Sequence, residues 1–289
     1  MDESKVSVII PFYSGKQWLI EALNSVVVQT FANIEVILVN DGSIENIDDI
    51  VEAFQQKISL KYYFIKNEGP AKARNYGISK SVGEYICFLD SDDVWHPEKI
   101  EKQYQSMKKG EYVWAVTDYE FFENGTNKNL GRNREIISGD VFELNLLRCF
   151  IATPTVMIRR SILINNPTIR FNETVKYGED TLFWYLLLSK YPLYNVKEIL
   201  TKVRVRGTNA ASRSKVQLFS RAKIYEFFKK KKFIINGKKM GKFTKIAYKM
   251  SYYFYQLSRN NEMFSKILYI FPWILFRLLY DIEKKKLRK

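Results

Sequence analysis

The chain contains the run Tyr85-Ile-Cys-Phe-Leu-Asp-Ser-Asp-Asp93, in which five mostly apolar residues lead directly into three carboxylates. A short apolar run that is rich in aromatic and branched side chains predicts a strand buried on both faces. In an open α/β sheet, ligands bind at the carboxyl ends of such strands, so we expect the acids to face a site rather than the core. The spacing of Asp90 and Asp92 suits Mn²⁺ or Mg²⁺, held by one or two carboxylates together with substrate phosphates. A solvated acidic turn before the next helix is the alternative interpretation.

Predicted strands and helices alternate along the amino-terminal part of the chain. Apolar runs predict strands at residues 6–10, 34–39, 60–65 and 85–89. Apolar residues at helical spacing predict helices between them, at residues 18–26, 48–54 and 71–79. This alternation predicts a parallel, doubly wound α/β sheet with right-handed crossovers.

Two common nucleotide-binding loops are missing from the sequence. Neither the dinucleotide fingerprint GxGxxG nor the phosphate loop GxxxxGK(S/T) follows a predicted strand, which argues against an NAD enzyme and a P-loop ATPase. Three strands end instead in the polar segments Pro11-Phe-Tyr13, Asp41 and Asp90-Ser91-Asp92. A nucleotide held by side chains and a metal fits these endings better than one held by a glycine loop.

The 289 residues include two cysteines, Cys87 and Cys149, and one histidine, His96. These residues can form neither a disulfide framework nor an ordinary Cys/His zinc site. Cys87 lies within the apolar strand and is expected to be a small core residue. His96 precedes Pro97 at a helix entry and is expected to be structural or solvated. No signal peptide is predicted, because the apolar run at residues 6–11 is only of strand length, so we expect a cytoplasmic protein.

The net charge of +15 lies entirely in the carboxyl-terminal part of the chain. Residues 1–220 hold 27 Lys and Arg against 27 acids, whereas residues 221–289 hold 19 against four. This division predicts a neutral domain at residues 1–220, with halves of about 1–110 and 111–220, followed by a basic, amphipathic helical appendage.

Aromatic residues alternate with lysines through this appendage, which contains the uncharged run Ile267-Leu-Tyr-Ile-Phe-Pro-Trp-Ile-Leu-Phe276. This run is too short for a bilayer span, which needs about 20 residues. Flanking cations at Lys266, Arg277 and residues 284–286 predict an interfacial helix on an anionic membrane surface. The alternative is a helical hairpin that packs its apolar side on the body. Nucleic-acid binding is not expected, because the body carries no recognition motif for it.

Five segments of the chain form a recognisable set: Val6-Ser-Val-Ile-Ile-Pro-Phe-Tyr, residues 29–43 with Asn40-Asp-Gly-Ser43, residues 67–77, residues 83–93 and Gly178-Glu-Asp180. Together they resemble the family 2 glycosyltransferases of bacterial surface-polysaccharide synthesis. They occur in the family's order and spacing and cover residues 5–215. The resemblance implies a GT-A (Rossmann-like), mostly parallel α/β sheet. It also implies transfer of one sugar, with inversion, from a nucleotide diphosphosugar.

The resemblance places the nucleotide of the donor at the strand ends. Asp41 matches the aspartate that binds the base, and an ionised carboxylate can accept the N3–H of uracil or thymine, which cytosine lacks. We therefore expect a UDP-linked donor. The alternative for Asp41 is a turn with Gly42 and Ser43. The other expected contacts to the nucleotide-sugar come from Pro11, Tyr13, Asn67, Arg74, Asn75, Asp90, Ser91 and Arg206.

The resemblance also assigns the metal and the catalytic base. Asp90 is expected to face the ribose and the metal, and Asp92 to coordinate Mn²⁺ or Mg²⁺ at the diphosphate. Arg74 can contact phosphate and can also pair with Asp90, which would hold the acidic loop in shape. Asp93 is expected to cap the following helix. Asp180 matches the base that takes the proton of the acceptor hydroxyl, with Glu179 as a supporting or acceptor-binding group. Capping of the helix that follows is the alternative for both.

One segment departs from the family pattern. Members often carry Arg-x-His before a serine-rich turn, and here the run is Val203-Arg-Val-Arg206-Gly-Thr-Asn-Ala-Ala-Ser212, with Arg206 in the place of the histidine. Arginine cannot ligate a cation but could contact the diphosphate directly, so the strength of the metal dependence stays open. Residues 153–160 resemble the strand on the acceptor side.

The predicted function is sugar transfer to a hydroxyl of a glycan or lipid-linked glycan at the inner face of the cell membrane. One alternative is a sugar nucleotidyltransferase, which would carry a basic, glycine-rich loop where Pro11-Phe-Tyr-Ser-Gly15 stands. The other is a non-catalytic module that binds membranes or glycans.

Overall fold

The computed structural model describes residues 4–133, 136–206, 214–258 and 260–287, and it divides into two compact units. The first, the sheet unit, comprises Met1–Gly139, Ile151–Glu173 and Leu193–Arg206. The second, the helical unit, comprises Asp140–Phe150, Thr174–Pro192 and Gly207–Lys289. Each unit is therefore assembled from segments that lie far apart in the sequence. The functional division predicted at residue 220 stays a prediction.

The described residues of the sheet unit form a nine-stranded sheet. Its strands are β1 (Val6–Phe12), β2 (Ile34–Asp41), β3 (Ser59–Ile65), β4 (Tyr85–Phe88), β5 (Val94–Trp95), β6 (Trp114–Glu123), β7 (Asn129–Asn133), β8 (Met157–Arg159) and β9 (Tyr194–Val205). Their order is β3-β2-β1-β4-β8-β6-β9-β5, and β7 pairs with β6. The first four strands pair in parallel, which confirms the predicted doubly wound sheet, and β8 continues the sheet antiparallel to β4.

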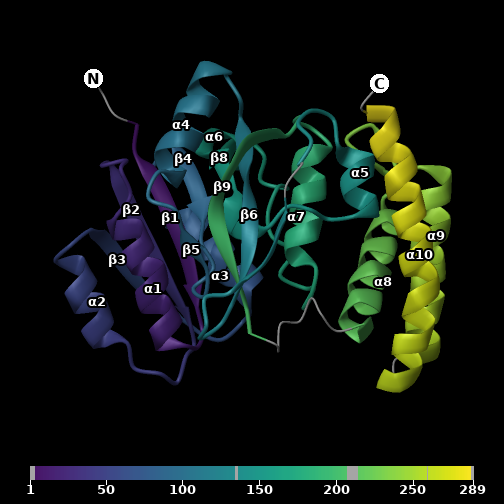
Figure 1. The fold of residues 1–289 in the computed structure, drawn as a ribbon, viewed down its shortest axis with the longest axis horizontal. Coiled ribbons are helices and arrows are strands. Elements are labelled where there is room, and N and C mark those ends of the chain that lie inside the picture. Colours follow the sequence, from purple (N-terminus) through teal and green to yellow (C-terminus); the bar gives the residue numbers. More distant parts are fainter. Residues whose placement is uncertain (1–3, 134–135, 207–213, 259, 288–289) are drawn as a thin grey trace. The chain divides into compact units, whose positions relative to one another are not determined.

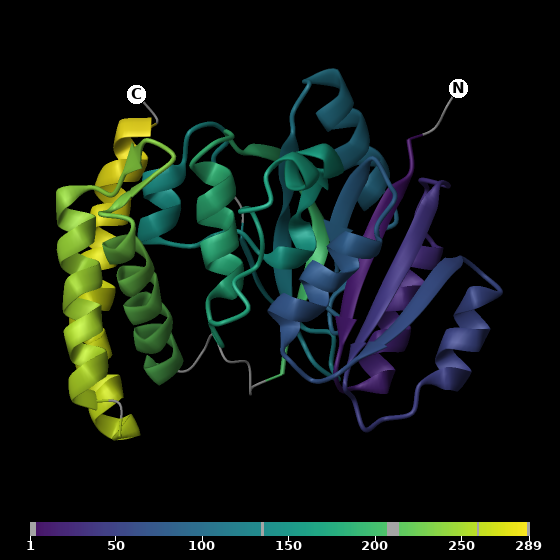
Figure 2. The same ribbon diagram turned by 180° about the vertical axis from the view of Figure 1, so that it is seen from behind.

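Helices cover both faces of the sheet. They are α1 (Lys16–Val27), α2 (Asp48–Gln55), α3 (Pro70–Lys80), α4 (Lys99–Lys109) and α6 (Arg160–Asn165). Two opposite views place α1 and α2 on one face of the strands and α3 on the other (Figures 1 and 2). The strand expected at residues 153–160 is shorter than predicted. Its first part is the 3-10 helix η1 (Thr153–Thr155), because Pro154 has no amide hydrogen for strand pairing.

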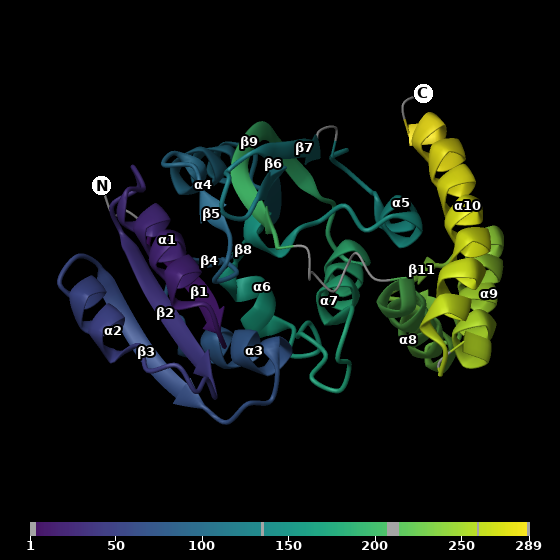
Figure 3. The same ribbon diagram turned by 60° about the horizontal axis from the view of Figure 1, so that its bottom comes forward.

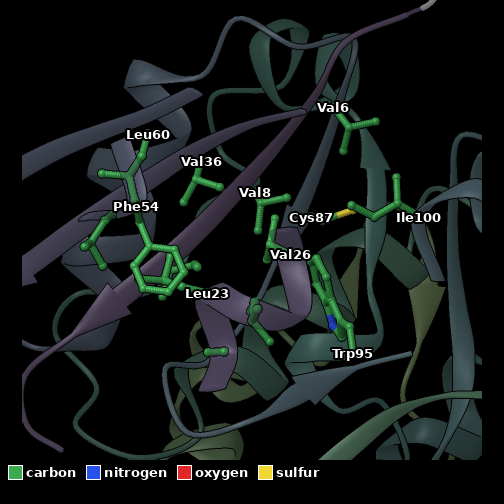
Figure 4. Packing of buried hydrophobic residues seen from close by; sticks show 14 of the residues in the cluster. Val6, Val8, Leu23, Val26, Val36, Phe54, Leu60, Cys87, Trp95 and Ile100 are labelled. Atoms are coloured by element: carbon green, nitrogen blue, oxygen red, sulfur yellow. The ribbon is translucent and has the colours of Figure 1, made fainter. Parts of the chain in front are cut away.

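The main hydrophobic core of the sheet unit lies between the strands and helices α1, α2 and α4 (Figure 4). Val6 and Val8 of β1 point into this core beside Cys87 of β4, which is fully buried as predicted. Ile9 points to the opposite face and lies against α3 at Gly77, where a Cβ would come within 2.4 Å of an Ile9 methyl group. The central strands are thus buried on both faces, and their ends are held in fixed positions.

The helical unit contains α5 (Phe142–Leu147), α7 (Glu179–Leu188), α8 (Ser214–Lys230), α9 (Lys242–Ser258) and α10 (Glu262–Leu287), with a hairpin of β10 (Ile234–Ile235) and β11 (Lys238–Lys239). The last three helices lie side by side in all three views (Figure 3). Inside the unit, the hydroxyls of Tyr185 and Tyr248 are 3.1 Å apart, and Tyr248 donates to the Leu146 carbonyl at 2.6 Å. Burial raises the pKa of both tyrosines, so both stay neutral hydrogen-bonding groups.

α10 continues through Pro272 and is longer than the uncharged run expected from the sequence. Within the described residues, Met263–Leu287 is long and apolar enough to cross a membrane by length and composition, with a mean hydropathy of 1.4. Only 17% of its most apolar window is buried. The helix is therefore apolar and largely exposed.

Candidate active site

The carboxyl ends of β1, β2 and β4 lie next to one another at one edge of the sheet. Phe12 at the end of β1 pairs in register with Asn40 of β2, and Ile9 of β1 pairs with Phe88 at the end of β4. Because β1 lies between β2 and β4, the strand order reverses there, and open α/β sheets bind ligands at such a point. The structure therefore brings five of the predicted nucleotide-sugar residues to one edge: Pro11, Tyr13, Asp41, Asp90 and Ser91.

Asp41 ties the end of β2 to the loop that begins α3. Its two carboxylate oxygens accept hydrogen bonds from the backbone amides of Glu68 and Gly69, both at 2.9 Å. The neighbouring residue Asn40, rather than Asp41, stabilises the turn through its side chain, because Asn40 Oδ1 accepts a hydrogen bond from the Ser43 amide at 2.8 Å. Asp41 is nearly fully buried but sits at a strand end, and a carboxylate oxygen can accept more than one hydrogen bond.

A close backbone approach at Gly42 holds Asn67 in the same region. Gly42 has a φ of +70°, and a Cβ there would lie 2.6 Å from the Asn67 amide nitrogen. Only glycine meets both requirements without strain. Asn67 is exposed, so its side chain is accessible beside the end of β2.

Arg74 of α3 pairs with Asp90, as the sequence suggested. Its Nη2 is 2.6 Å from Asp90 Oδ1, and its guanidinium lies 5.3 Å from the centre of the Phe171 ring. The next residue, Asn75, exchanges hydrogen bonds with the backbone of Phe171 at 2.9 and 3.0 Å and also donates to Glu173. The side-chain amide of Asn75 is therefore engaged by residues 171–173. This geometry does not favour the predicted contact between Asn75 and a nucleotide.

Arg206 reaches the second carboxylate of the acidic segment. Its Nε is 3.1 Å from Asp92 Oδ2, and its guanidinium lies 4.9 Å from the centre of the Trp18 ring of α1. The departure from the family pattern thus brings a cation to the acidic segment. The rest of that run, residues 207–212, lies outside the described residues.

Arg204 also contacts the acidic segment, and the sequence did not mark it as a site residue. Its buried guanidinium donates to the Asp92 carbonyl at 2.7 Å and pairs with Glu21 of α1 at 2.6 Å. The Arg204 backbone amide donates to Asp93 Oδ1 at 2.8 Å. The prediction that Asp93 caps the following helix is therefore wrong, because its carboxylate is buried against β9. The available signal was the alternation Val203-Arg-Val-Arg206, which puts both arginines on one face of a strand.

Burial and like charges act together on the acidic segment. Burial, and then the neighbouring Asp90 carboxylate, raises the pKa of Asp92, while Arg206 and Arg204 oppose this. The pKa of Asp93 is raised well above its ordinary value, chiefly by burial. A divalent cation would relieve this repulsion, and two carboxylates are what Mn²⁺ or Mg²⁺ ordinarily takes from a protein beside substrate phosphates. The donor set of Asp90 and Asp92 fits such an ion, although the described residues contain no cluster of three or more potential ligands.

Glu179 and Asp180 belong to the helical unit, where they form the first turn of α7. Gly178 precedes them at a φ of +87°, and a Cβ there would lie 2.3 Å from the Ser220 hydroxyl. Asp180 Oδ1 accepts hydrogen bonds from the amide and hydroxyl of Thr181, at 2.6 and 3.2 Å. Asp180 thus satisfies one of the unpaired amides at the helix start, and Glu179 is nearly buried.

His96, which the sequence marked as structural or solvated, is half exposed. Its ring lies 3.8 Å from the Glu98 carboxylate, and its Nδ1 accepts the Glu98 amide at 3.4 Å. These contacts at the entry of α4 support the structural interpretation.

Comparisons with known proteins agree with this fold. Residues 7–166 match the model of the family described as glycosyl transferase family 2. Structurally, the chain resembles residues 1–349 of S. aureus TarS with a TM-score of 0.64 and 21% identity, over 89% of this chain and 73% of that 349-residue segment.

Curated relatives carry related names. An uncharacterized glycosyltransferase of Rickettsia bellii (strain RML369-C) is 39% identical over 207 residues, which are 72% of this chain and 30% of the relative. TuaG of Bacillus subtilis (strain 168), named as a candidate glycosyltransferase of teichuronic acid biosynthesis, is 30% identical over 72% of this chain and 81% of TuaG. The chain spans about a third of the length of this relative and of two similar Rickettsia proteins. The family match, which covers more than half of the chain, nevertheless shows that it belongs to glycosyl transferase family 2.

Proposed function

We propose that this protein transfers one sugar from a UDP-linked donor to a hydroxyl of a glycan or lipid-linked glycan in surface-polysaccharide synthesis. The observation that carries the proposal is the meeting of Asp41, the Arg74–Asp90 pair and the Arg206–Asp92 pair around the ends of β2 and β4. Family 2 membership supports the reaction class. Support for the donor comes from TarS, which has been solved with UDP and with UDP-GlcNAc, and support for the acceptor comes from the name of TuaG.

Asp41 is proposed to select the base. Its carboxylate already accepts two backbone amides, so it is held in place at the strand end. Each oxygen has a second lone pair, and one of these can accept the N3–H of uracil. Cytosine offers no hydrogen at N3, so the same carboxylate would repel a CDP-linked donor.

Asp90, Asp92 and Arg206 are proposed to hold the diphosphate. A divalent cation bound by the two carboxylates would neutralise the charge that develops on the leaving UDP. Arg206 stands beside Asp92 and can add hydrogen bonds to a phosphate oxygen through its planar guanidinium. Arg74 is proposed to fix the rotamer of Asp90, because the nearly buried Arg74 side chain forms an ion pair with that carboxylate.

Asp180 is proposed to be the base of an inverting displacement. The acceptor oxygen forms its bond to the anomeric carbon while the bond from that carbon to the phosphate oxygen breaks. UDP departs with the bonding electrons, and the hydroxyl proton passes to the Asp180 carboxylate. The assignment of Asp180 and of Glu179 beside it rests on their place in the Gly178-Glu-Asp180 segment.

The test is a comparison of UDP and CDP binding to the wild type and to Asp41→Asn. Wild type should prefer UDP by about tenfold or more, as expected for a charge-assisted hydrogen bond. The asparagine variant should shift the ratio towards CDP, because its amide can donate to cytosine N3. Damage to the Glu68–Gly69 loop would weaken both nucleotides equally, so the ratio reports recognition and not structure.

A panel of nucleotide sugars separates the rival functions. A glycosyltransferase should release UDP from UDP-sugars. Exchange of pyrophosphate into a nucleoside triphosphate would instead identify a sugar nucleotidyltransferase. Absence of nucleotide binding with and without Mn²⁺ would leave only a non-catalytic module.

A further inference from the structure

The outer face of α10 carries a continuous row of exposed apolar side chains. Its members are separated by one, three or four residues and are each 45–74% exposed: Met263, Ile267, Ile270, Phe271, Ile274, Leu278 and Ile282. Residues at such spacing lie on one face of a helix. The row is about 28 Å long at 1.5 Å per residue. We refer to these seven residues as the outer row.

The opposite face of α10 is fastened to the other helices of its unit. Phe276 is buried, with its ring centre 4.9 Å from that of Tyr248 and 4.3 Å from the Arg221 guanidinium. The Ser265 hydroxyl lies 3.0 Å from the carbonyl oxygens of both Ser258 and Asn261. α10 therefore has two different faces, and the outer row belongs to a helix that is already docked.

Cations and a tryptophan border the outer row. Trp273 is 43% exposed, and the Arg277 guanidinium lies 5.5 Å from its ring. Lys266 directly precedes Ile267 of the row, and residues 284–286 form a lysine cluster in the last turn of α10. Residues 221–289 carry the whole net charge of +15. An apolar row with tryptophan and cations at its border is the composition of a helix that lies at a lipid interface.

We propose that the outer row of α10 docks flat on an anionic lipid membrane while the inner face stays packed on α8 and α9. The seven side chains enter the boundary between headgroups and acyl chains, and the lysines contact acidic headgroups. This inference is independent of the proposed reaction. It also joins the two alternatives from the sequence, since one face packs on protein and the other is available to lipid.

Two other arrangements fit the observations less well. A membrane span would have to remove Phe276 from Tyr248 and Arg221 and place Arg277 and Asp281 in the hydrocarbon layer, which is costly. A second copy on the outer row would bring two strongly basic segments together, and like charges disfavour that contact. An anionic membrane is the occupant that the charge of the segment favours.

The experiment is vesicle co-sedimentation of the full chain, with phosphatidylcholine vesicles and with vesicles containing 30% phosphatidylglycerol as probes. The double variant Ile270→Glu/Ile274→Glu should lower binding to the anionic vesicles by at least about tenfold, since each change removes an apolar side chain from the interface. The matched control is Ile44→Glu/Val82→Glu, which also introduces two acids at exposed apolar positions, here in the sheet unit, and should bind as wild type does. Melting temperatures should agree for all three proteins, because the changed residues lie on exposed faces.

Further outcomes decide between membrane docking and its rivals. Changing Lys284, Lys285 and Lys286 to Gln should weaken binding to anionic vesicles by about fivefold per lysine, an effect that salt removes. Bound protein should be released by alkaline carbonate, whereas retention there would indicate a span. Wild type that ignores both vesicle types, but whose dimer is broken by the double variant in sedimentation velocity, would overturn the proposal in favour of self-association.

Discussion

The two acidic segments of this chain, Asp90-Ser-Asp92-Asp93 and Gly178-Glu-Asp180, look alike in sequence but are held in different ways. In the first, each acid has a partner far along the chain: Arg74 for Asp90, Arg206 for Asp92, and the Arg204 amide for Asp93. In the second, Asp180 accepts hydrogen bonds from its own neighbour, Thr181.

This difference predicts which substitutions should change both stability and donor binding and which should leave the backbone unchanged. The 90–93 segment is braced from α3 and β9, so a change in a bracing arginine should alter both stability and the geometry offered to a donor. Asp180 depends on the start of one helix, where an isosteric change leaves the backbone in place. The predictions below test this contrast, from the largest expected effect to the smallest.

Asp180→Asn should lower turnover by about 10²–10⁴, the usual contribution of general-base catalysis, because an amide cannot take up the acceptor proton. UDP affinity and melting temperature should barely change, since asparagine keeps the shape and much of the capping ability. Sugar transfer measured beside UDP titration checks both. Glu179→Gln is the control and should be milder. A dead Glu179→Gln with an active Asp180→Asn would move the base to the neighbour, and silence of both would leave a helix-start role.

Arg204→Met should lower the free energy of unfolding of the sheet unit by about 1–3 kcal/mol, because the Asp92 carbonyl is left without its donor, whereas Glu21 is 43% exposed and stays solvated. It should also weaken UDP binding, because the Asp92 carbonyl loses its donor. Chemical denaturation and UDP titration measure the two effects. The matched control is Lys202→Met on the same strand, whose exposed ion pair with Glu120 should contribute less than about 1 kcal/mol. Equal effects of the two substitutions would mean that the acidic segment is not braced through Arg204.

Removal of the divalent metal should weaken UDP binding to the wild type by about tenfold or more, since the cation offsets the repulsion between carboxylates and phosphates. In Asp92→Asn most of this dependence should disappear. Calorimetric titration with Mn²⁺ and with a chelator compares the two proteins. If chelation leaves the wild-type affinity unchanged, Arg206 rather than a metal serves the diphosphate.

Lys99 of α4 differs from the paired acids above, because it is buried and has no ion pair among the described contacts. Its Nζ lies 4.0 Å from the centre of the Trp95 ring, and burial lowers the pKa of the ammonium group from its ordinary value of 10.5. The Lys99 amine therefore binds its proton more tightly in the unfolded chain than in the folded one. At neutral pH this difference lowers the free energy of unfolding. Lys99→Met should raise the unfolding free energy by about 1 kcal/mol at pH 7. Denaturation at several pH values should find that this gain shrinks as the pH approaches 10.5.

Much of the fold and of the site was predictable from the sequence. The parallel strands were found because apolar runs of strand length alternate with helical spacing, which is a local property of the chain. Asp41, Asp90 and Asp92 were found because polar residues directly follow such runs, and parallel strands bring those endings to one edge. The pairing of Arg74 with Asp90 was foreseen from its chemistry. The roles of Asp41, Arg206 and Asp180 in binding and catalysis stay predictions.

The sequence by itself determined the order of strands and helices, the placement of acids at strand ends and the basic charge of the last segment, because each depends on neighbouring residues. Tertiary structure decided which distant groups meet. Arg204 lies 112 positions from Asp92, Asp93 turned to β9 instead of capping a helix, and Asn40 rather than Asp41 formed the turn. It also decided that α10 buries one face and exposes the other. The physical reason is the same in each case: a charged or apolar side chain takes the partner that packing brings within contact, and packing joins segments that are remote in the sequence.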